Sequence, residues 1–222
     1  MSSSIPSSVF QFLHDITKNN NRDWFAEHKP KYQEAHESLV KFADEVIHKM
    51  NQTDTIETVS GKKAIFRIYK DVRFSKDKQP YKTQVSAIVT PSGKKSKAIN
   101  GVYFELGPEH LRVYGGAYEI EKEDILSMRE GIADNIKEFQ KKYTDPLFVK
   151  TFGELKGEKN KIIPKELKEA AEKESLIFNK QWYFYTQFEP ETILFDNLDE
   201  TIINCYKAGR PVEEFFNKLI KK

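Results

Sequence analysis

The chain has 222 residues, of which 38% are hydrophobic and 13% aromatic, and its formal net charge is +2. This length and composition suit a folded protein with a sizeable core and argue against an intrinsically disordered chain. The single cysteine, Cys205, excludes a disulfide within the chain. No apolar run approaches the roughly 18 residues of a membrane span, and the polar opening MSSSIPSS lacks the pattern of a secretory leader. We therefore expect a cytoplasmic protein without a membrane partner.

The first fifty residues have the apolar spacing of helices. Apolar side chains recur at helical intervals from Val9 to Ile16, and three consecutive asparagines end that element. Asn21 is placed to cap a short helical turn that follows. Pro30 suits the first turn of a longer helix, whose buried stripe covers residues 32–50.

The middle of the chain changes to a period of two, which is typical of strands. Apolar side chains alternate with others over residues 64–75, 83–90, 101–106 and 111–118. A lysine-rich turn or loop begins at Pro91. The short spacing between these strands predicts antiparallel hairpins.

Helices return in the second half. The spacing predicts a helix over 121–142, a loop over 153–164, a short helix from residue 164 and a strand over 181–188. Two C-terminal helices are expected, separated by Gly209-Arg210-Pro211, because glycine favours a helix end and proline a helix start. We predict that residues 1–222 form a single α+β domain with a mainly antiparallel sheet and helices packed on one face.

Positive charge is concentrated in one segment. Residues 60–100 carry a net charge of +9, so the remainder carries −7. Such a split favours an anionic partner at one face. The alternative is that the fold pairs the two oppositely charged parts internally.

The face of the predicted sheet that points away from the core has an unusual composition of arginines, tyrosines and amides. Guanidinium groups bind phosphate or carboxylate through two hydrogen bonds, and tyrosines offer flat surfaces for bases or sugars. The alternative is an amphipathic sheet whose tyrosines pack under helices. With the turn that follows residue 75, the candidate ligand-binding residues are Arg67, Tyr69, Asp71, Arg73, Ser75, Lys78, Lys82, Tyr103 and Arg112.

Asp71 has three possible roles, because it lies between Arg67 and Arg73 on the predicted face. It could hold an arginine in position for a ligand, form an ordinary salt bridge, or be a general base, a role for which Glu105 is the other candidate. The lysines of the following turn, residues 76–82, could contact a phosphate or could simply be solvated.

Common catalytic motifs are absent from the sequence. It has no G-x-G-x-x-G, no G-x-S-x-G and no H-E-x-x-H pattern, and Cys205 falls on an apolar stripe. The five histidines are expected to be surface or packing residues, and Gly115-Gly116 marks a close approach or a bulge. No metal site is predicted, and the sequence identifies neither a cofactor nor a reaction.

Two motifs carry a resemblance to a known family. Asn20-Asn21-Arg22-Asp23-Trp24-Phe25 and the segment FRIYKDVRFSKDKQPYKT at 66–83 closely resemble a widespread uncharacterised family of microbial and fungal proteins, domain of unknown function 2461. The segment from Gly101 to Gly116 also fits its pattern, whereas Lys70 replaces the usual arginine of the motif, and a Pro-Lys-Gly-like segment is missing near 157–165. The resemblance covers nearly the whole chain and implies one α+β domain, with no established reaction, cofactor or substrate.

Three hypotheses for function follow from these residues. The chain binds a small anionic ligand, phosphorylated or nucleotide-like, with or without catalysis; it binds nucleic acid with the same face; or it is a protein-interaction scaffold. The sequence does not predict an oligomeric state.

Overall fold

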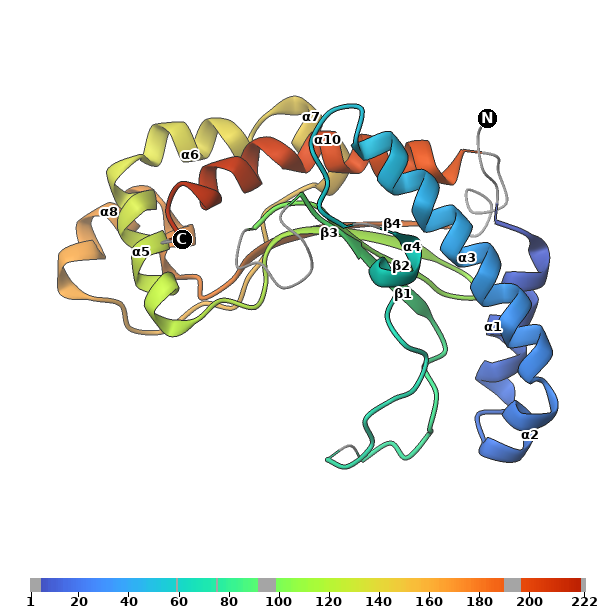
Figure 1. Cartoon of the computed structure of the whole chain (residues 1–222). Coiled ribbons are helices and arrows are strands. Elements are labelled where there is room, and N and C mark those ends of the chain that lie inside the picture. Colours follow the sequence, from blue (N-terminus) through green and yellow to red (C-terminus); the bar gives the residue numbers. More distant parts are fainter. Residues whose placement is uncertain (1–4, 59, 75, 92–98, 190–196, 221–222) are drawn as a thin grey trace. The chain divides into compact units, whose positions relative to one another are not determined.

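The computed structural model describes residues 5–58, 60–74, 76–91, 99–189 and 197–220 (Figure 1). The fold-class prediction is confirmed, since these residues form nine α-helices and a four-stranded antiparallel sheet. The strands are β1 (Val85–Val89), β2 (Val102–Leu106), β3 (Leu111–Ala117) and β4 (Trp182–Phe188), in the spatial order β1-β2-β3-β4. None of the described helices is long and apolar enough to cross a membrane.

The chain divides into two compact units. The first comprises residues 1–94, 102–113 and 187–203, and the second comprises residues 95–101, 114–186 and 204–222. The single-domain organisation therefore stays a proposal, which the continuity of β3, β4 and the C-terminal helix through both units supports.

The first unit packs helices against β1 and β2. Its helices are α1 (Ser7–Lys18), α2 (Arg22–Glu27), α3 (Lys29–Met50) and α4 (Gly61–Ala64). Asn21 caps α2 by accepting a hydrogen bond from the backbone N–H of Trp24, and proline lies in the first turn of α3, both as predicted. The α3 side chain Phe42 meets Phe104 of β2 edge to face, with ring centroids 5.9 Å apart. This contact lies in the core that positions β1 and β2.

The register of β1 against β2 fixes which side chains share a face. Val85 lies opposite Leu106 and Val89 opposite Val102, so Ser86 is paired with Glu105. Ala87 and Phe104 are buried on the face that carries the helices. Ser86 and Glu105 therefore point to the second face, as the alternation predicts.

The predicted strand over 64–75 is wrong. Residues 65–84 form an arm that leaves the sheet after α4, turns, and returns to β1 (Figure 1). Its two limbs are joined by an isolated bridge between Tyr69 and Tyr81, and Ile65 makes another with Ala87. The limbs exchange a few backbone hydrogen bonds, such as Lys82 N–H to the Ile68 carbonyl at 2.8 Å. The alternating pattern is that of an extended chain, but among the described residues no further strand pairs with it to complete a sheet.

The second unit is mainly helical, and two helix predictions in it need correction. Its elements are α5 (Lys122–Asp134), α6 (Ile136–Tyr143), α7 (Pro146–Phe152), α8 (Lys168–Lys173), the 3-10 turns Lys165–Leu167 and Ser175–Phe178, and most of α10 (Leu198–Asn217). The predicted helix 121–142 is broken at Asn135, which ends α5 and precedes α6. The predicted pair of C-terminal helices is one continuous helix with Pro211 inside it.

Glycine at 209 serves packing instead of ending a helix. A Cβ there would lie 2.5 Å from the ring of Phe184, so only glycine lets α10 approach β4 this closely. This close contact explains why the glycine-proline pattern, which usually separates helices, is found here within one helix.

A buried carboxylate also joins α10 to two glycines in the second unit. Glu213 accepts hydrogen bonds from the backbone N–H of Gly101 at 3.1 Å and of Gly116 at 2.9 Å, and it is 3% exposed. Both glycines have positive φ, +113° and +88°, which side-chain-bearing residues rarely adopt. Burial raises the pKa of Glu213 to about 7, although the two backbone donors oppose the rise.

Candidate functional site

A cluster of two cations and two aromatic rings lies where the arm joins the sheet, within the first unit. The Lys82 ammonium lies 5.6 Å from the centre of the Phe66 ring, and Phe66 lies 6.0 Å from the Tyr103 ring on β2. Arg67 follows Phe66 and is close enough to Lys82 to lower its pKa. We call Phe66, Arg67, Lys82 and Tyr103 the root site.

The positive charge of the root site is not neutralised by a bonded carboxylate. Among the described residues, no Asp or Glu lies within ion-pair distance of Arg67 or Lys82. The pKa of Lys82 is lowered, first by partial burial and then by repulsion from Arg67, while Glu105 partly opposes this. The pKa of Tyr103 is raised, chiefly because burial disfavours the phenolate. An anion bound here would relieve the repulsion between the two cations.

Glu105 anchors a hydrogen-bonded network beside the root site. It is 8% exposed and accepts hydrogen bonds from Gln84 at 2.8 Å and from Arg112 at 3.2 Å. The His110 ring nitrogen lies 3.3 Å from the same carboxylate oxygen as Arg112. Arg112 in turn donates to the Gln187 amide oxygen at 2.7 Å. Both oxygens of Glu105 accept hydrogen bonds, so this network supports the face.

The sequence analysis missed His110. It placed Glu105, Arg112, Gln84 and Gln187 on one face from strand alternation, but it treated the histidines as surface or packing residues. Gly107 lets the imidazole fold back towards Glu105, because a Cβ on Gly107 would lie 2.3 Å from that ring. The sequence signal for this contact was the spacing of Gly107 and His110, a glycine followed three residues later by a histidine in a hairpin turn.

The outer part of the arm holds other predicted residues away from this cluster. Arg73 binds Asp71 through two hydrogen bonds, Nε to Oδ1 at 3.0 Å and Nη2 to Oδ2 at 2.7 Å. The pKa of Asp71 is lowered by its hydrogen bonds with Arg73 and by the nearby Arg67 charge. Lys78 donates to the Val72 carbonyl at 3.0 Å, so it closes the turn of the arm. The observed pairing fits both the role in which Asp71 holds Arg73 for a ligand and that of an ordinary salt bridge.

Tyr69 belongs to an aromatic cluster on the inner side of the arm. Its ring lies 6.0 Å from Phe25 of α2 and 5.5 Å from Tyr81, and Phe25 stacks on Tyr81 at 4.1 Å. The Asn20 amide donates to the Tyr81 carbonyl at 2.9 Å and accepts from its N–H at 3.1 Å. These contacts tie the arm to the segment that joins α1 and α2.

The structure therefore divides the predicted site residues into groups. Arg67, Lys82, Tyr103 and Arg112 lie at or beside the root site, Tyr69 lies in the aromatic cluster, and Asp71, Arg73 and Lys78 lie in the outer arm. Ser75 lies outside the described residues. The sheet alternation predicted one continuous face, and the departure of the arm from the sheet explains why there are three locations.

Comparison with known protein families gives one match. Residues 8–215 match the family described as conserved hypothetical protein (DUF2461). The chain belongs to the DUF2461 family. No curated protein matches the chain.

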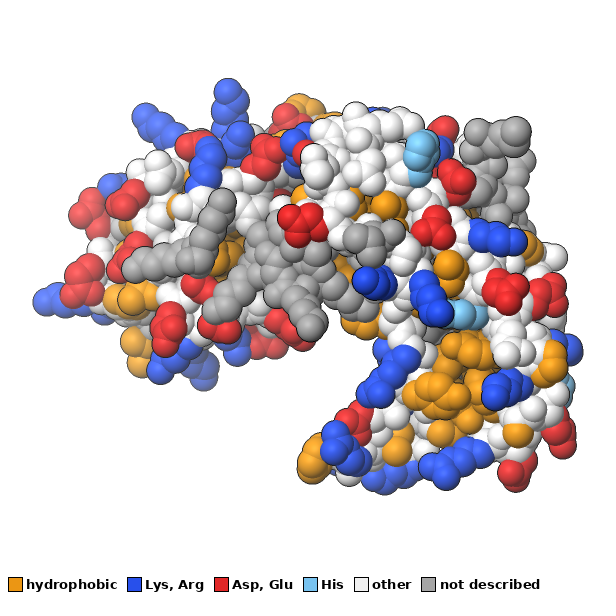
Figure 2. All heavy atoms as spheres, in the orientation of Figure 1, with side chains coloured by type: hydrophobic (Ala, Val, Ile, Leu, Met, Phe, Trp, Pro, Cys, Tyr) orange, Lys and Arg blue, Asp and Glu red, His pale blue; other side chains and the backbone are white. Residues whose placement is uncertain are grey.

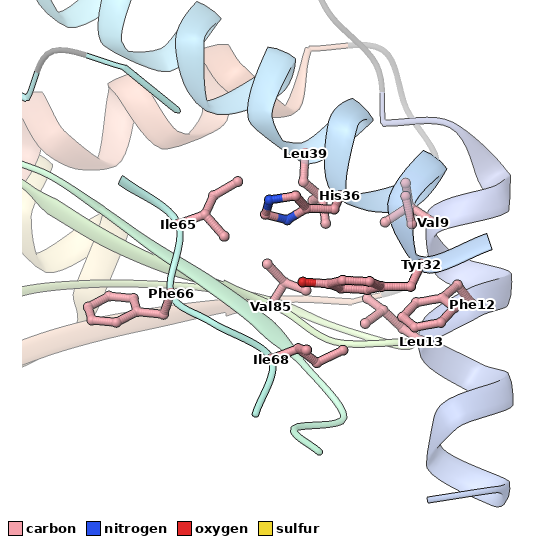
Figure 3. Close-up of a pocket in the computed structure, with 11 residues that line it drawn as sticks. Val9, Phe12, Leu13, Tyr32, His36, Leu39, Ile65, Phe66, Ile68 and Val85 are labelled. Atoms are coloured by element: carbon pink, nitrogen blue, oxygen red, sulfur yellow. The ribbon is translucent and has the colours of Figure 1, made fainter. Parts of the chain in front are cut away.

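This DUF2461 protein also has a small apolar pocket in its first unit (Figure 3). Tyr32 and His36 of α3 are its only polar side chains, with ring centroids 5.6 Å apart, and the remainder of the lining comes from α1, α3, the start of the arm and β1. Burial raises the pKa of Tyr32 and lowers that of His36. The enclosed space, about 10 Å³, is close to the least that holds one water molecule. The pocket is thus too small for the anionic ligand considered for this DUF2461 protein.

Two further features of this DUF2461 protein are its possible metal ligands and its single cysteine. Within the described part of the chain, no three His, Cys, Asp or Glu side chains are grouped to hold a metal ion. Cys205 is buried, and burial raises the pKa of its thiol to about 12, so the thiolate is strongly disfavoured.

Proposed function

We propose that the protein binds a small anionic ligand, phosphorylated or nucleotide-like, at the root site. The observation that carries the proposal is that Arg67 lies close enough to Lys82 to lower its pKa, while no carboxylate of the described residues lies at ion-pair distance from either cation. Adjacent cations repel each other, and a ligand with two or more anionic oxygens can bind both at once.

The neighbouring side chains suit a ligand with a flat group next to its charge. Phe66 and Tyr103 present rings beside Lys82, and a base or sugar could pack against them. The network around Glu105 holds this face rigid, because Gln84, His110 and Arg112 all contact one buried carboxylate. A pre-organised face loses less entropy when a ligand binds.

The arrangement favours binding over acid–base catalysis. Glu105 is occupied by its own donors, and Asp71 is held by Arg73 in the outer arm. The lowered pKa of Lys82 is explained by burial and by Arg67. We therefore assign no reaction to the root site.

The test is a thermal-shift titration with inorganic phosphate, AMP and ATP. A ligand at about 100 times its Kd should stabilise the wild type by roughly 2.7 kcal/mol. Arg67→Gln and Lys82→Gln should each remove most of this shift, because each deletes one of the two charges. Lys41→Gln is the matched control, since Lys41 is an exposed α3 lysine of the same unit.

Two outcomes of this titration would refute binding at the root site. If no probe raises the melting temperature of the wild type, or if Lys82→Gln keeps the full shift, the root site does not bind anions. The first outcome would favour a protein-interaction scaffold.

A further inference from the structure

The end of the arm carries the most exposed large hydrophobic side chain of the described residues. Phe74 is 95% exposed, and the Arg73 guanidinium carbon lies 5.8 Å from the centre of its ring. Arg73 is itself fixed by its two hydrogen bonds to Asp71. The ring is therefore held beside a guanidinium group and remains open to solvent, so a second flat group could stack on it.

Further cations lie near Phe74 in the sequence. Lys70 bonds Asp77, and Asp71 bonds Arg73, so both carboxylates of the outer arm are already paired. Lys76 and Lys78 are exposed, and no carboxylate of the described residues lies at ion-pair distance from either. Lys and Arg side chains line the arm, and hydrophobic groups lie at its end (Figure 2). The arm thus combines excess positive charge with exposed aromatic side chains, of which Phe74 is the most exposed.

These charges are distributed along the arm, which favours an extended ligand over a compact one. Arg67 and Lys82 lie at the root, whereas Phe74, Lys76 and Lys78 lie near the turn. Phe74 lies seven positions after Arg67, and an extended chain advances about 3.3 Å per residue, so the two residues lie up to roughly 23 Å apart. A small anion can occupy only one of these positions, whereas a polymer with one charge per repeating unit can occupy several.

We infer that the arm binds single-stranded nucleic acid, with one base stacked on Phe74 and phosphates on Lys76 and Lys78. Proteins that bind single strands combine aromatic platforms with a track of cations, and stacking needs an unpaired base. A duplex has its bases already stacked and offers none to the ring. The stacking and the phosphate contacts of this inference rest on Phe74, Lys76 and Lys78. The choice of a polymer also uses the charges of Arg67 and Lys82, but it does not require that a small ligand binds at the root site.

The experiment measures fluorescence anisotropy of labelled oligo-dT and oligo-U of about 15 nucleotides, titrated with the full chain. We expect the affinity to fall between about 50 and 200 mM salt, with a log–log slope of about −0.7 for each phosphate contact. Phe74→Ala should weaken binding roughly 5- to 100-fold, as the loss of one stacked base predicts. Lys76→Gln and Lys78→Gln should each make the slope shallower by about 0.7.

Ile162→Ala is the matched control for Phe74→Ala. Ile162 is 82% exposed and lies in the second unit, so its truncation removes an exposed apolar side chain without touching the arm. It should leave the affinity unchanged. Because Phe74 is exposed, Phe74→Ala should also leave the melting temperature unchanged, which separates lost binding from lost folding.

Several results would overturn the inference. Absence of oligonucleotide binding at the lowest salt would do so, as would wild-type affinity in Phe74→Ala. The protein could instead bind phosphatidylserine vesicles or polyglutamate in a Phe74-dependent way and show no such binding to oligonucleotides. The partner of the arm would then be a lipid surface or an acidic protein, and the inference would be wrong. Lys82→Gln distinguishes the two proposals, since it should abolish the phosphate or nucleotide shift while the difference between wild type and Phe74→Ala persists.

Discussion

We expect Glu213 to make the stability of the protein depend on pH between about 4.5 and 7. The side chain is 3% exposed and lies between the backbone N–H groups of Gly101 and Gly116. Its pKa is raised from 4.5 to about 7, chiefly by burial and with a smaller contribution from Glu214. The proton is therefore bound more tightly in the folded chain than in the unfolded chain.

The sign and size of the effect follow from this difference. Below pH 4.5 the carboxyl is protonated in both states, and its full contribution to stability is present. As the pH rises, the unfolded chain ionises first, so the free energy of unfolding falls until the folded carboxyl has also ionised above pH 7. Each pKa unit corresponds to 1.36 kcal/mol, so the total loss should be roughly 3 kcal/mol.

Urea unfolding of the wild type and of Glu213→Gln, measured from pH 4.5 to 8, tests this expectation. The variant will itself differ in stability, because an amide offers one acceptor where the carboxylate offers two. The informative quantity is the wild-type minus variant difference, which should decrease by roughly 3 kcal/mol as the pH rises. Glu214→Gln is the control, since Glu214 is exposed and pairs with Arg210, and it should keep most of the wild-type slope. A difference that stays flat over this range would show that Glu213 titrates as an ordinary carboxyl.

Three further predictions concern stability and need only melting curves or urea titrations. Asn21→Ala should cost about 1 kcal/mol through loss of the α2 cap, and Asn21→Ser should restore most of it. Asn20→Ala should cost about 1–3 kcal/mol, because it removes both hydrogen bonds to the Tyr81 backbone; an unchanged midpoint would mean that water replaces the amide. Gly209→Ala should cost about 1–3 kcal/mol by forcing a methyl group against Phe184, and a stabilised variant would show that α10 can move away.

The sequence predicted helices and strands correctly where the spacing of apolar residues is compatible with only one kind of element. The strands β1 to β4 were expected within one or two residues of their bounds, because alternation on a half-buried sheet has few other causes. Residues 64–75 show the same alternation, yet they form the first limb of the arm. A period of two indicates an extended chain, and only the presence of a neighbouring strand makes such a chain part of a sheet.

The sequence predicted most of the residues that make up the root site and its neighbouring network, but it did not predict how these residues are arranged in space. Alternation placed Glu105 and Arg112 on one face, and the structure joins them directly at 3.2 Å. Arg67 and Lys82 are fifteen positions apart in sequence, so only the return of the arm brings them together. Arg73 was expected on the same face as Arg67, but no sequence pattern revealed that both lie on an arm that leaves the sheet.

The two hydrogen bonds between the Asn20 side-chain amide and the Tyr81 backbone affect how the arm binds a ligand. A hairpin with so few cross-limb hydrogen bonds would sample many orientations if it were free, and a ligand would have to select one of them. The side-chain amide restricts this freedom before any encounter, since it satisfies a donor and an acceptor of the returning limb. Asn20 should therefore raise the affinity of the arm for a ligand without contacting that ligand, because it limits the number of arm conformations that cannot bind.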